Sequence, residues 1–172
     1  MYAGTSGGAL AALVGFTGID TRVALETMVD LSLDDNVHRN VDSVLRREVM
    51  KLLMTKYPTE NEKQMFLEKV NDKTERLNLC VTRVWPEPST KPMIVSQFSS
   101  VDDLVDVTAA SCFIPIWSKL ANVGVTTLIS GRSSQSESTK LLEETLTVVD
   151  GGFTAFMPPI GNCRVSPFPE KY

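Results

Sequence analysis

The sequence predicts an α/β fold around a mainly parallel sheet, and three features of the chain point to it. From Ser6 to about Lys56, apolar residues recur three and four positions apart, as they do in amphipathic helices. Two extended segments follow, Leu77 to Trp85 and Met93 to Phe98. Helical periodicity then returns, and a short apolar strand from Leu146 to Val149 comes after it. Helices and strands that alternate in this way favour a layered α/β domain.

Helices are expected to dominate the first third of the chain. Gly15 and Gly18 mark the end of a first helix, and Asp20 is positioned to cap a second. The second and third helices each have one apolar face, made by Ala24, Leu25, Met28, Val29 and Leu31 and by Val41, Val44, Leu45, Val49, Leu52 and Leu53. Pro58 and Thr59 then open a charged segment in which a fourth helix is expected.

The second half of the chain is expected to supply the sheet. Pro86 to Thr90 is a turn-rich stretch of hairpin length, so the two extended segments beside it are predicted to pair. Ser100 and Asp103 have the spacing of a capping box, which predicts a helix that runs to about Ala110. Arg164 to Ser166 predicts a last short strand.

One segment is expected to lie outside this regular structure. Residues 122–138 are polar and rich in serine, which predicts a mobile surface loop. The chain has no internal repeat, and its length fits one ordinary domain. We therefore expect residues 1–172 to form a single domain.

Charge and cysteine usage exclude several classes of function. The chain carries 17 Lys and Arg against 21 Asp and Glu, so no overall positive field would attract a nucleic acid. Cys80, Cys112 and Cys163 are widely spaced and form no CxxC pair, which argues against a disulfide framework and a zinc site. The apolar run from Ala9 to Phe16 is too short for a membrane span, which needs roughly 20 residues. We expect free thiols in a reducing compartment, no metal and no nucleic-acid partner.

The strongest chemical signal is Gly4-Thr5-Ser6-Gly7-Gly8, followed directly by the helix-forming run from Ala9 to Leu13. This is the pattern of a G-x-S-x-G elbow, in which a strand turns sharply into a helix and exposes the serine. Glycine is needed on either side because the turn leaves no room for Cβ atoms. The Gly7 N–H is the best placed donor for the negative oxygen of an attacked ester. Taken alone, the pentapeptide also fits an ordinary loop or a phosphate-binding turn.

A serine hydroxyl is a poor nucleophile until a base accepts its proton. Asp150 ends the predicted strand, is followed by Gly151 and Gly152, and is the acid best placed to accept that proton directly. Apolar neighbours would desolvate its carboxylate and raise its pKa. The same tripeptide also fits a plain Asp-Gly turn. His38, the one histidine of the chain, lies at the polar start of a predicted helix and is interpreted as a surface residue.

These motifs together resemble a known family. Gly4 to Ala9 with Asp150-Gly151-Gly152 resembles the Ser-Asp dyad of patatin-like phospholipases, and Ala110 to Pro115 looks like the segment that links the two motifs. Other segments are similar to the adipose triglyceride lipase and adiponutrin branch: Leu79 to Arg83, Ile94 to Phe98, Cys112 to Pro115, Val149 to Gly152 and Val165 to Phe168. The resemblance implies a three-layer α/β/α fold with a mainly parallel central sheet.

The resemblance also implies an activity, the hydrolysis of lipid acyl esters. Ser6 would form an acyl-enzyme, and Asp150 would take and return the proton, with no metal and no cofactor. The substrates would be triacylglycerols, related neutral glycerolipids or phospholipids met at a lipid surface. The protein would be cytoplasmic and peripheral to lipid droplets or membranes.

The sequence departs from the family at its start. Members carry a glycine-rich oxyanion loop upstream of the elbow, and this chain begins three residues before Gly4. We therefore expect an N-terminally truncated domain that lacks the first strand, this loop and most of the elbow strand, so that the serine lies on an incompletely paired sheet. The alternative function is a catalytically silent patatin-like module that binds lipid surfaces or protein partners. A Ser-His-Asp triad ranks last, because in that fold the histidine follows the acid and none follows Asp150.

Overall fold

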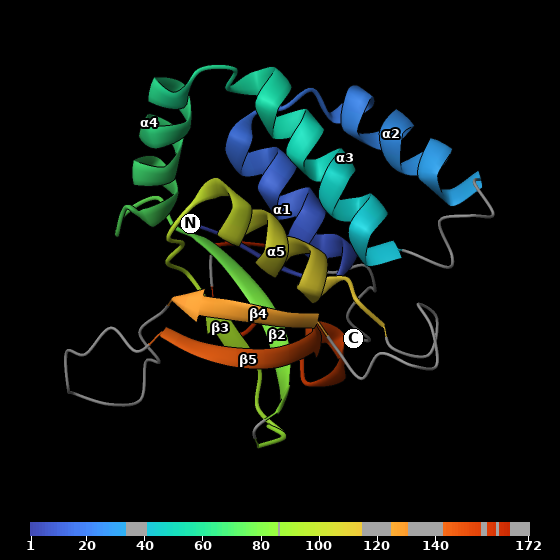
Figure 1. The fold of residues 1–172 in the computed structure, drawn as a ribbon, viewed down its shortest axis with the longest axis vertical. Helices are drawn as coiled ribbons and strands as arrows, with labels where there is room; N and C mark the ends of the chain where they lie inside the picture. Colours follow the sequence, from blue (N-terminus) through green and yellow to red (C-terminus); the bar gives the residue numbers. More distant parts are fainter. Residues whose placement is uncertain are drawn as a thin grey trace.

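The computed structural model describes residues 1–33, 41–85, 87–114, 125–130, 143–155, 158–160 and 162–165. Its helices are α1 (Gly7–Thr17), α2 (Thr21–Leu33), α3 (Val41–Lys56), α4 (Glu60–Asn71) and α5 (Val101–Ser111), with a short 3-10 helix, η2 (Gly151–Phe153). Its strands are β1 (Tyr2–Thr5), β2 (Leu77–Trp85), β3 (Met93–Val95), β4 (Val125–Ser130), β5 (Glu143–Asp150) and β6 (Cys163–Val165). Figure 1 shows the helices gathered above the sheet.

The predicted α/β class is confirmed, with a sheet that is more mixed than expected. The described strands form one sheet in the order β4-β5-β2-β1-β6, and β3 pairs with β2 outside that path. β1 lies parallel to both β2 and β6, whereas β3 and β5 run antiparallel to β2, and β4 antiparallel to β5. The β2–β3 pair is the predicted hairpin, whose short connection permits only antiparallel pairing.

The five described α-helices all lie on one face of this sheet. α1 and α5 contact the strands and each other, and α2 packs on α1 while α3 packs on α5. α4 joins the same side because its Phe66 ring lies beside that of Phe16. Alternate residues of β2, Leu77, Leu79 and Val81, are buried in the hydrophobic core under these helices. The described residues contribute no α-helix to the opposite face, where a three-layer arrangement has its second helical layer.

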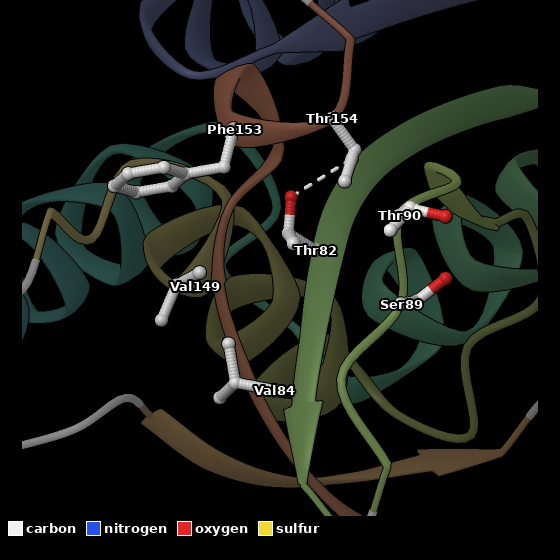
Figure 2. A pocket seen from close by; sticks show the side chains of 7 residues that line it. All are labelled: Thr82, Val84, Ser89, Thr90, Val149, Phe153 and Thr154. Carbon is white, nitrogen blue, oxygen red and sulfur yellow. Dashed lines mark hydrogen bonds between the residues drawn. The ribbon is translucent and has the colours of Figure 1, made fainter.

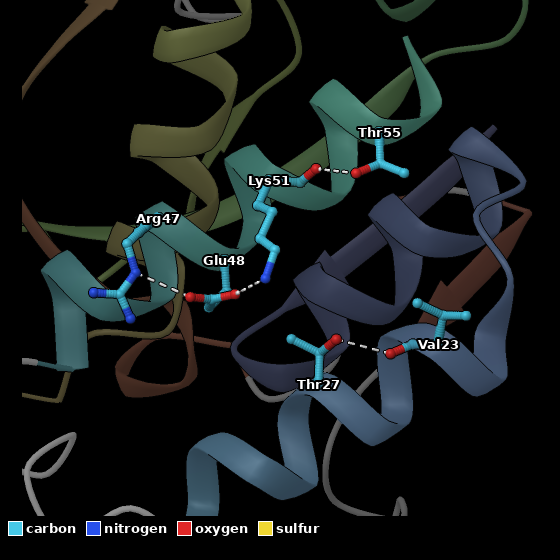
Figure 3. Close-up of polar contacts among 6 residues, drawn as sticks. All are labelled: Val23, Thr27, Arg47, Glu48, Lys51 and Thr55. Atoms are coloured by element: carbon cyan, nitrogen blue, oxygen red, sulfur yellow. Dashed lines mark hydrogen bonds and ion pairs between the residues drawn. The ribbon is translucent and has the colours of Figure 1, made fainter. Parts of the chain in front are cut away.

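The outer helices are held by local polar contacts on their exposed sides. The Thr27 hydroxyl donates to the Val23 carbonyl in α2, with 2.8 Å between the oxygens, and Thr55 donates to Lys51 in α3 at the same distance. Glu48 forms ion pairs with Arg47 and Lys51 along α3 (Figure 3). Each contact joins residues within one helical turn, so these contacts stabilise α2 and α3 themselves and do not fix where the two helices pack.

The expected loop over residues 122–138 is wrong for one part. Val125–Ser130 forms β4, which pairs antiparallel with β5 from Val125 opposite Val148 to Ser130 opposite Glu143. The physical reason is the local sequence Val-Thr-Thr-Leu-Ile, a run of β-branched and apolar residues that suits a strand despite the serines after it. The other residues of 122–138 lie outside the described part of the chain.

The sheet is paired on both sides of the elbow strand, where the sequence predicts an incompletely paired sheet. β1 is short, but it has a neighbour on each side: Tyr2 to Thr5 align with Leu77 to Cys80 of β2, and Tyr2 to Gly4 align with Cys163 to Val165 of β6. The predicted final strand thus supplies the second partner of the elbow strand. A strand with hydrogen-bonded neighbours on both edges is a rigid support for the residue that follows it.

Candidate functional site

The elbow at the end of β1 gives Ser6 an unusual backbone conformation. Ser6 has φ 55° and ψ −133°, and it is the only non-glycine residue with a positive φ among those described. Such a conformation costs on the order of 1–3 kcal/mol and persists only where the surroundings enforce it. Although Ser6 stands at the N-cap position of α1, its hydroxyl makes no capping bond. The hydroxyl is therefore free for another partner.

Gly4 is required by the sharpness of the turn. A Cβ atom at this position would overlap the carbonyl oxygen of Gly8 and lie 2.6 Å from the Cα atom of Ala9. Both are backbone atoms of the first turn of α1, so they have no side-chain freedom with which to move aside. The sequence argument that the elbow leaves no room for a Cβ atom is confirmed at Gly4.

Asp150, 144 positions from Ser6 along the chain, is the partner of its hydroxyl. The Ser6 Oγ donates to Asp150 Oδ2 with 2.5 Å between the oxygens. Asp150 ends β5 opposite Val81 of β2, and only 3% of its surface is exposed. Two strand ends that are not adjacent in the sheet order therefore bring a hydroxyl and a buried carboxylate into direct contact.

Burial sets the basicity of Asp150. Desolvation raises the pKa of its carboxyl group above the usual range, and the hydrogen bonds from the Ser6 hydroxyl and the Gly152 N–H oppose that rise. The second of these bonds joins Gly152 N to Asp150 Oδ1 at 2.6 Å. The raised pKa makes this carboxylate a stronger proton acceptor than an exposed aspartate.

The Asp150-Gly151-Gly152 motif does more than turn the chain. It opens the 3-10 helix η2, and Asp150 caps that helix through the same Gly152 bond. A Cβ atom at Gly151 would overlap the carbonyl oxygen of Cys80, because η2 passes directly over β2. The plain Asp-Gly turn of a two-residue hairpin does not describe this geometry. Gly151 lets Asp150 approach the strand beside the elbow.

The N-terminus of α1 is the part of the site suited to a negative charge. The first N–H groups of a helix have no partner within it, and the Gly7 N–H is the first of α1. No acidic side chain occupies the first turn of α1, so nothing there neutralises its partial positive charge. Gly7 is also exposed, which leaves its N–H accessible to a ligand.

Three residues at the site were not singled out as functional from the sequence. Ser111 and Cys112, at the end of α5, hydrogen-bond to the backbone of Ser6. The Thr82 hydroxyl donates to the Asp150 carbonyl oxygen, with 2.9 Å between the oxygens. Two signals could have found the first two: the predicted helix that delivers the chain to Ser111, and the resemblance of Ala110 to Pro115 to the segment that links the two family motifs. His38 and Pro115 lie outside the described residues.

A pocket of about 440 Å³ lies next to the Asp150 strand end. It is lined by Thr82, Val84, Ser89, Thr90, Val149, Phe153 and Thr154 (Figure 2). Thr82 and Thr154 hydrogen-bond to each other at 2.8 Å within it. Neither Ser6 nor Asp150 lines this pocket, which opens on the face of the sheet without α-helices.

Two features are absent from the part of the chain that the structure describes. No group of three or more His, Cys, Asp or Glu side chains there could hold a metal ion. None of the helices described is both long and apolar enough to cross a membrane. The chemistry that the described side chains themselves support is proton transfer from the Ser6 hydroxyl to a carboxylate.

Comparison with known proteins adds one finding. A family model described as patatin-like phospholipase matches residues 1–160. No curated protein and no solved structure matches the chain. The matched range contains both the elbow around Ser6 and the motif that begins at Asp150.

Proposed function

The chain belongs to the patatin-like phospholipase family, a family of lipid acyl hydrolases, and from this premise we propose that it hydrolyses lipid acyl esters with Ser6 as nucleophile and Asp150 as general base. The observation that carries the proposal is the 2.5 Å hydrogen bond between Ser6 Oγ and Asp150 Oδ2. A nucleophile and a base within hydrogen-bond reach are the minimum arrangement for covalent catalysis at an ester.

The proposed reaction has two halves that use the same two side chains. As Ser6 Oγ bonds to the ester carbonyl carbon, its proton passes to Asp150 Oδ2, and the carbonyl electron pair moves onto oxygen. When the ester C–O bond breaks, Asp150 returns that proton to the leaving alcohol, and an acyl-enzyme remains. A water molecule then loses a proton to Asp150 and attacks the acyl carbon. As the bond between the acyl carbon and Ser6 Oγ breaks, Asp150 returns that proton to Ser6 Oγ, which releases the fatty acid and restores both side chains.

The tetrahedral intermediate needs donors for its negative oxygen. The Gly7 N–H at the start of α1 is the donor we assign, because it belongs to the residue directly after the nucleophile. Removal of one such donor commonly slows an acyl transfer about 10²- to 10³-fold. The absence of an acidic side chain from the first turn of α1 supports this assignment.

For the substrate we propose triacylglycerols, related neutral glycerolipids or phospholipids, met at a lipid surface. The support is the resemblance to the adipose triglyceride lipase and adiponutrin branch. We further propose that the protein is cytoplasmic and peripheral to lipid droplets or membranes. Co-flotation with triolein emulsions coated by phosphatidylcholine measures this directly, and a protein that stays in the aqueous fraction contradicts it.

The test of the activity is hydrolysis of a short-chain p-nitrophenyl ester and of emulsified triacylglycerol. We expect Ser6→Ala and Asp150→Asn each to abolish hydrolysis of both substrates while circular dichroism shows an unchanged fold. Ser32→Ala and Asp30→Asn, exposed on α2, are the matched controls and keep full activity. If the folded wild-type chain hydrolyses neither substrate faster than Ser6→Ala, the catalytic proposal fails, and the lipid-binding silent module takes its place.

A further inference from the structure

We propose that Ser111 and Cys112 are positioning residues, which hold the backbone of Ser6 from both sides and thereby aim both the nucleophile and the Gly7 N–H. This inference rests on the proposed function, in which Ser6 is the nucleophile. Both residues come from the C-terminal end of α5, more than 100 positions along the chain from the elbow.

The first contact holds the N–H of Ser6. This N–H donates to Ser111 Oγ with 3.1 Å between nitrogen and oxygen. The Ser111 hydroxyl in turn donates its own proton to the carbonyl oxygen of Cys80, at 2.7 Å. A hydroxyl has one proton and two lone pairs, so donation to Cys80 leaves an acceptor for Ser6. Ser111 is fully buried, and it links the residue after β1 to Cys80 within β2.

The second contact holds the carbonyl of Ser6. The Cys112 thiol donates to this oxygen with 3.1 Å between sulfur and oxygen, and the Ala9 N–H donates to the same oxygen at 2.7 Å. Burial, with the nearby charge of Asp150, raises the pKa of the Cys112 thiol, so it remains protonated and able to donate. The strained residue is thus bonded at both of its backbone polar groups.

We call the two contacts from Ser111 and Cys112 to the backbone of Ser6 the clamp. The geometry of the peptide unit links this clamp to catalysis. The Ser6 carbonyl and the Gly7 N–H belong to one planar trans peptide, so they point in opposite directions. A bond that fixes the carbonyl therefore also fixes the direction of the Gly7 N–H. Because the Ser6 N–H is already bonded to Ser111, it cannot serve as an oxyanion donor. The clamp leaves the Gly7 N–H as the donor at the elbow and sets where it points.

The same short segment also holds the base. The Asp150 N–H donates to the carbonyl oxygen of Phe113, with 2.9 Å between nitrogen and oxygen. Three consecutive residues, from Ser111 to Phe113, thus bond to the backbone of either the nucleophile or the base. Movement of the end of α5 would shift both, which gives the segment a role beyond packing.

Steady-state kinetics provide the first test, with one variant that removes the donor at Cys112 and one that restores a donor there. Cys112→Ala should lower kcat for a short-chain p-nitrophenyl ester about tenfold or more with little change in KM, since it loosens an oxyanion donor. Cys112→Ser, which restores a donor to the same carbonyl, should recover most of that loss. Cys163→Ala, an exposed cysteine on β6, is the control and keeps wild-type kinetics. Equal kcat values for wild type, Cys112→Ala and Cys112→Ser overturn the role of the thiol.

Amide hydrogen exchange measured by NMR provides the second test, independent of activity. The clamp predicts a protected Ser6 amide in the wild type and in Cys112→Ala, and a rapidly exchanging one in Ser111→Ala. Ser111→Thr, which keeps the hydroxyl, should retain protection. A Ser6 amide that exchanges equally in Ser111→Ala and the wild type overturns the clamp. If the wild type is inactive but its Ser6 amide is protected and that protection is lost in Ser111→Ala, the clamp is supported and the proposed function is contradicted.

Discussion

The two consecutive helices α1 and α2 have opposite environments. α1 is buried along much of its length, with Gly8, Ala9, Ala12, Leu13, Phe16 and Thr17 all in the interior. Ala24 is the one buried residue of α2, and Leu25 and Leu33 are 64% and 77% exposed although both are apolar. A sequence pattern of apolar residues at helical spacing therefore describes both helices but does not distinguish their burial.

The difference shows where the site obtains its rigidity. Ser6, the proposed nucleophile, stands at the N-terminus of α1, and this helix contacts β1, β2, β6, α2 and α5, so its position is fixed on several sides. α2 is peripheral and contributes no residue to the contacts around Ser6. We therefore expect changes at α1 to affect stability and activity together, and changes on α2 to affect neither strongly.

The largest effect on stability is expected for a substitution at Gly4, before α1, and a smaller one for the same substitution at Gly18, after α1. Gly4→Ala forces backbone atoms apart, and we expect a loss of about 4 kcal/mol or more in the free energy of unfolding, beyond the usual range of point mutants. Gly18→Ala, where φ is 64° and no atom lies near the added Cβ, should cost only about 1–2 kcal/mol. Urea denaturation measures both. Equal losses would contradict the close packing of the elbow.

The next largest effect on stability is expected for Leu13 on α1, with Leu25 on α2 as its matched control. Leu13 on α1 is 3% exposed, so Leu13→Ala should lower the free energy of unfolding by about 3 kcal/mol through the cavity that it leaves. Leu25→Ala on α2 should change it by less than about 0.5 kcal/mol. Thermal denaturation of both variants under one condition checks the comparison, and a large loss from Leu25→Ala would show that the Leu25 side chain is buried in the protein in solution.

The pH dependence of hydrolysis should report Asp150, the hydrogen-bond partner of Ser6 at the entry to α1. In the proposed reaction the active form is the ionised carboxylate, so kcat/KM should fall about tenfold per pH unit below its pKa. Because burial raises that pKa, the midpoint of the fall should lie above about 3.9, the usual value for aspartate. Asp30→Asn on α2 should leave the profile unchanged, and a midpoint at or below the usual value would contradict a desolvated base.

The same shift has a consequence for stability with a definite sign. A raised pKa in the folded state means that the native protein binds this proton more tightly than the unfolded chain does. The contribution of Asp150 to the free energy of unfolding therefore falls as pH rises from the usual pKa to the raised one. In Ser6→Ala, which removes a bond to the carboxylate, an NMR titration should find the pKa of Asp150 higher still.

The smallest effect is expected for the exposed ion pair on α2. Arg22 Nε and Glu26 Oε1 are 2.9 Å apart, but both side chains are largely exposed. Glu26→Gln should change the free energy of unfolding by no more than about 0.5 kcal/mol, and less at high salt. Chemical denaturation at low and high ionic strength measures it. A loss well above this range would indicate that α2 is tied to the domain by charge.

Local signals in the sequence predict several elements well. Asp20 caps α2 through the Arg22 N–H, and Ser100 caps α5 through the Asp103 N–H, as their spacing indicates. The elbow pattern around Ser6 predicts a strand followed directly by a helix, and the structure has both. Each of these features depends on residues within one helical turn of each other, so a short stretch of sequence is enough to predict it.

Long-range contacts have no such local signature. The Ser111 hydroxyl contacts Ser6 across 105 positions, and its neighbours in the sequence do not show which distant backbone group it bonds. The pairing of β6 with β1 and the antiparallel run of β5 beside β2 depend likewise on how the whole sheet assembles. β4 was not predicted, because the serine-rich composition of residues 122–138 as a whole indicated a loop although the short run Val125–Ser130 contains β-branched residues.

The most direct test of the central claim is covalent trapping of the nucleophile. A fluorophosphonate probe reacts with an activated serine, and tryptic mass spectrometry identifies the residue that carries it. We expect the adduct on Ser6 in the wild type, far slower labelling in Asp150→Asn, and none on the exposed Ser32. Absence of an adduct on Ser6 in the folded protein, or equal labelling rates in the wild type and Asp150→Asn, would contradict a Ser-Asp dyad.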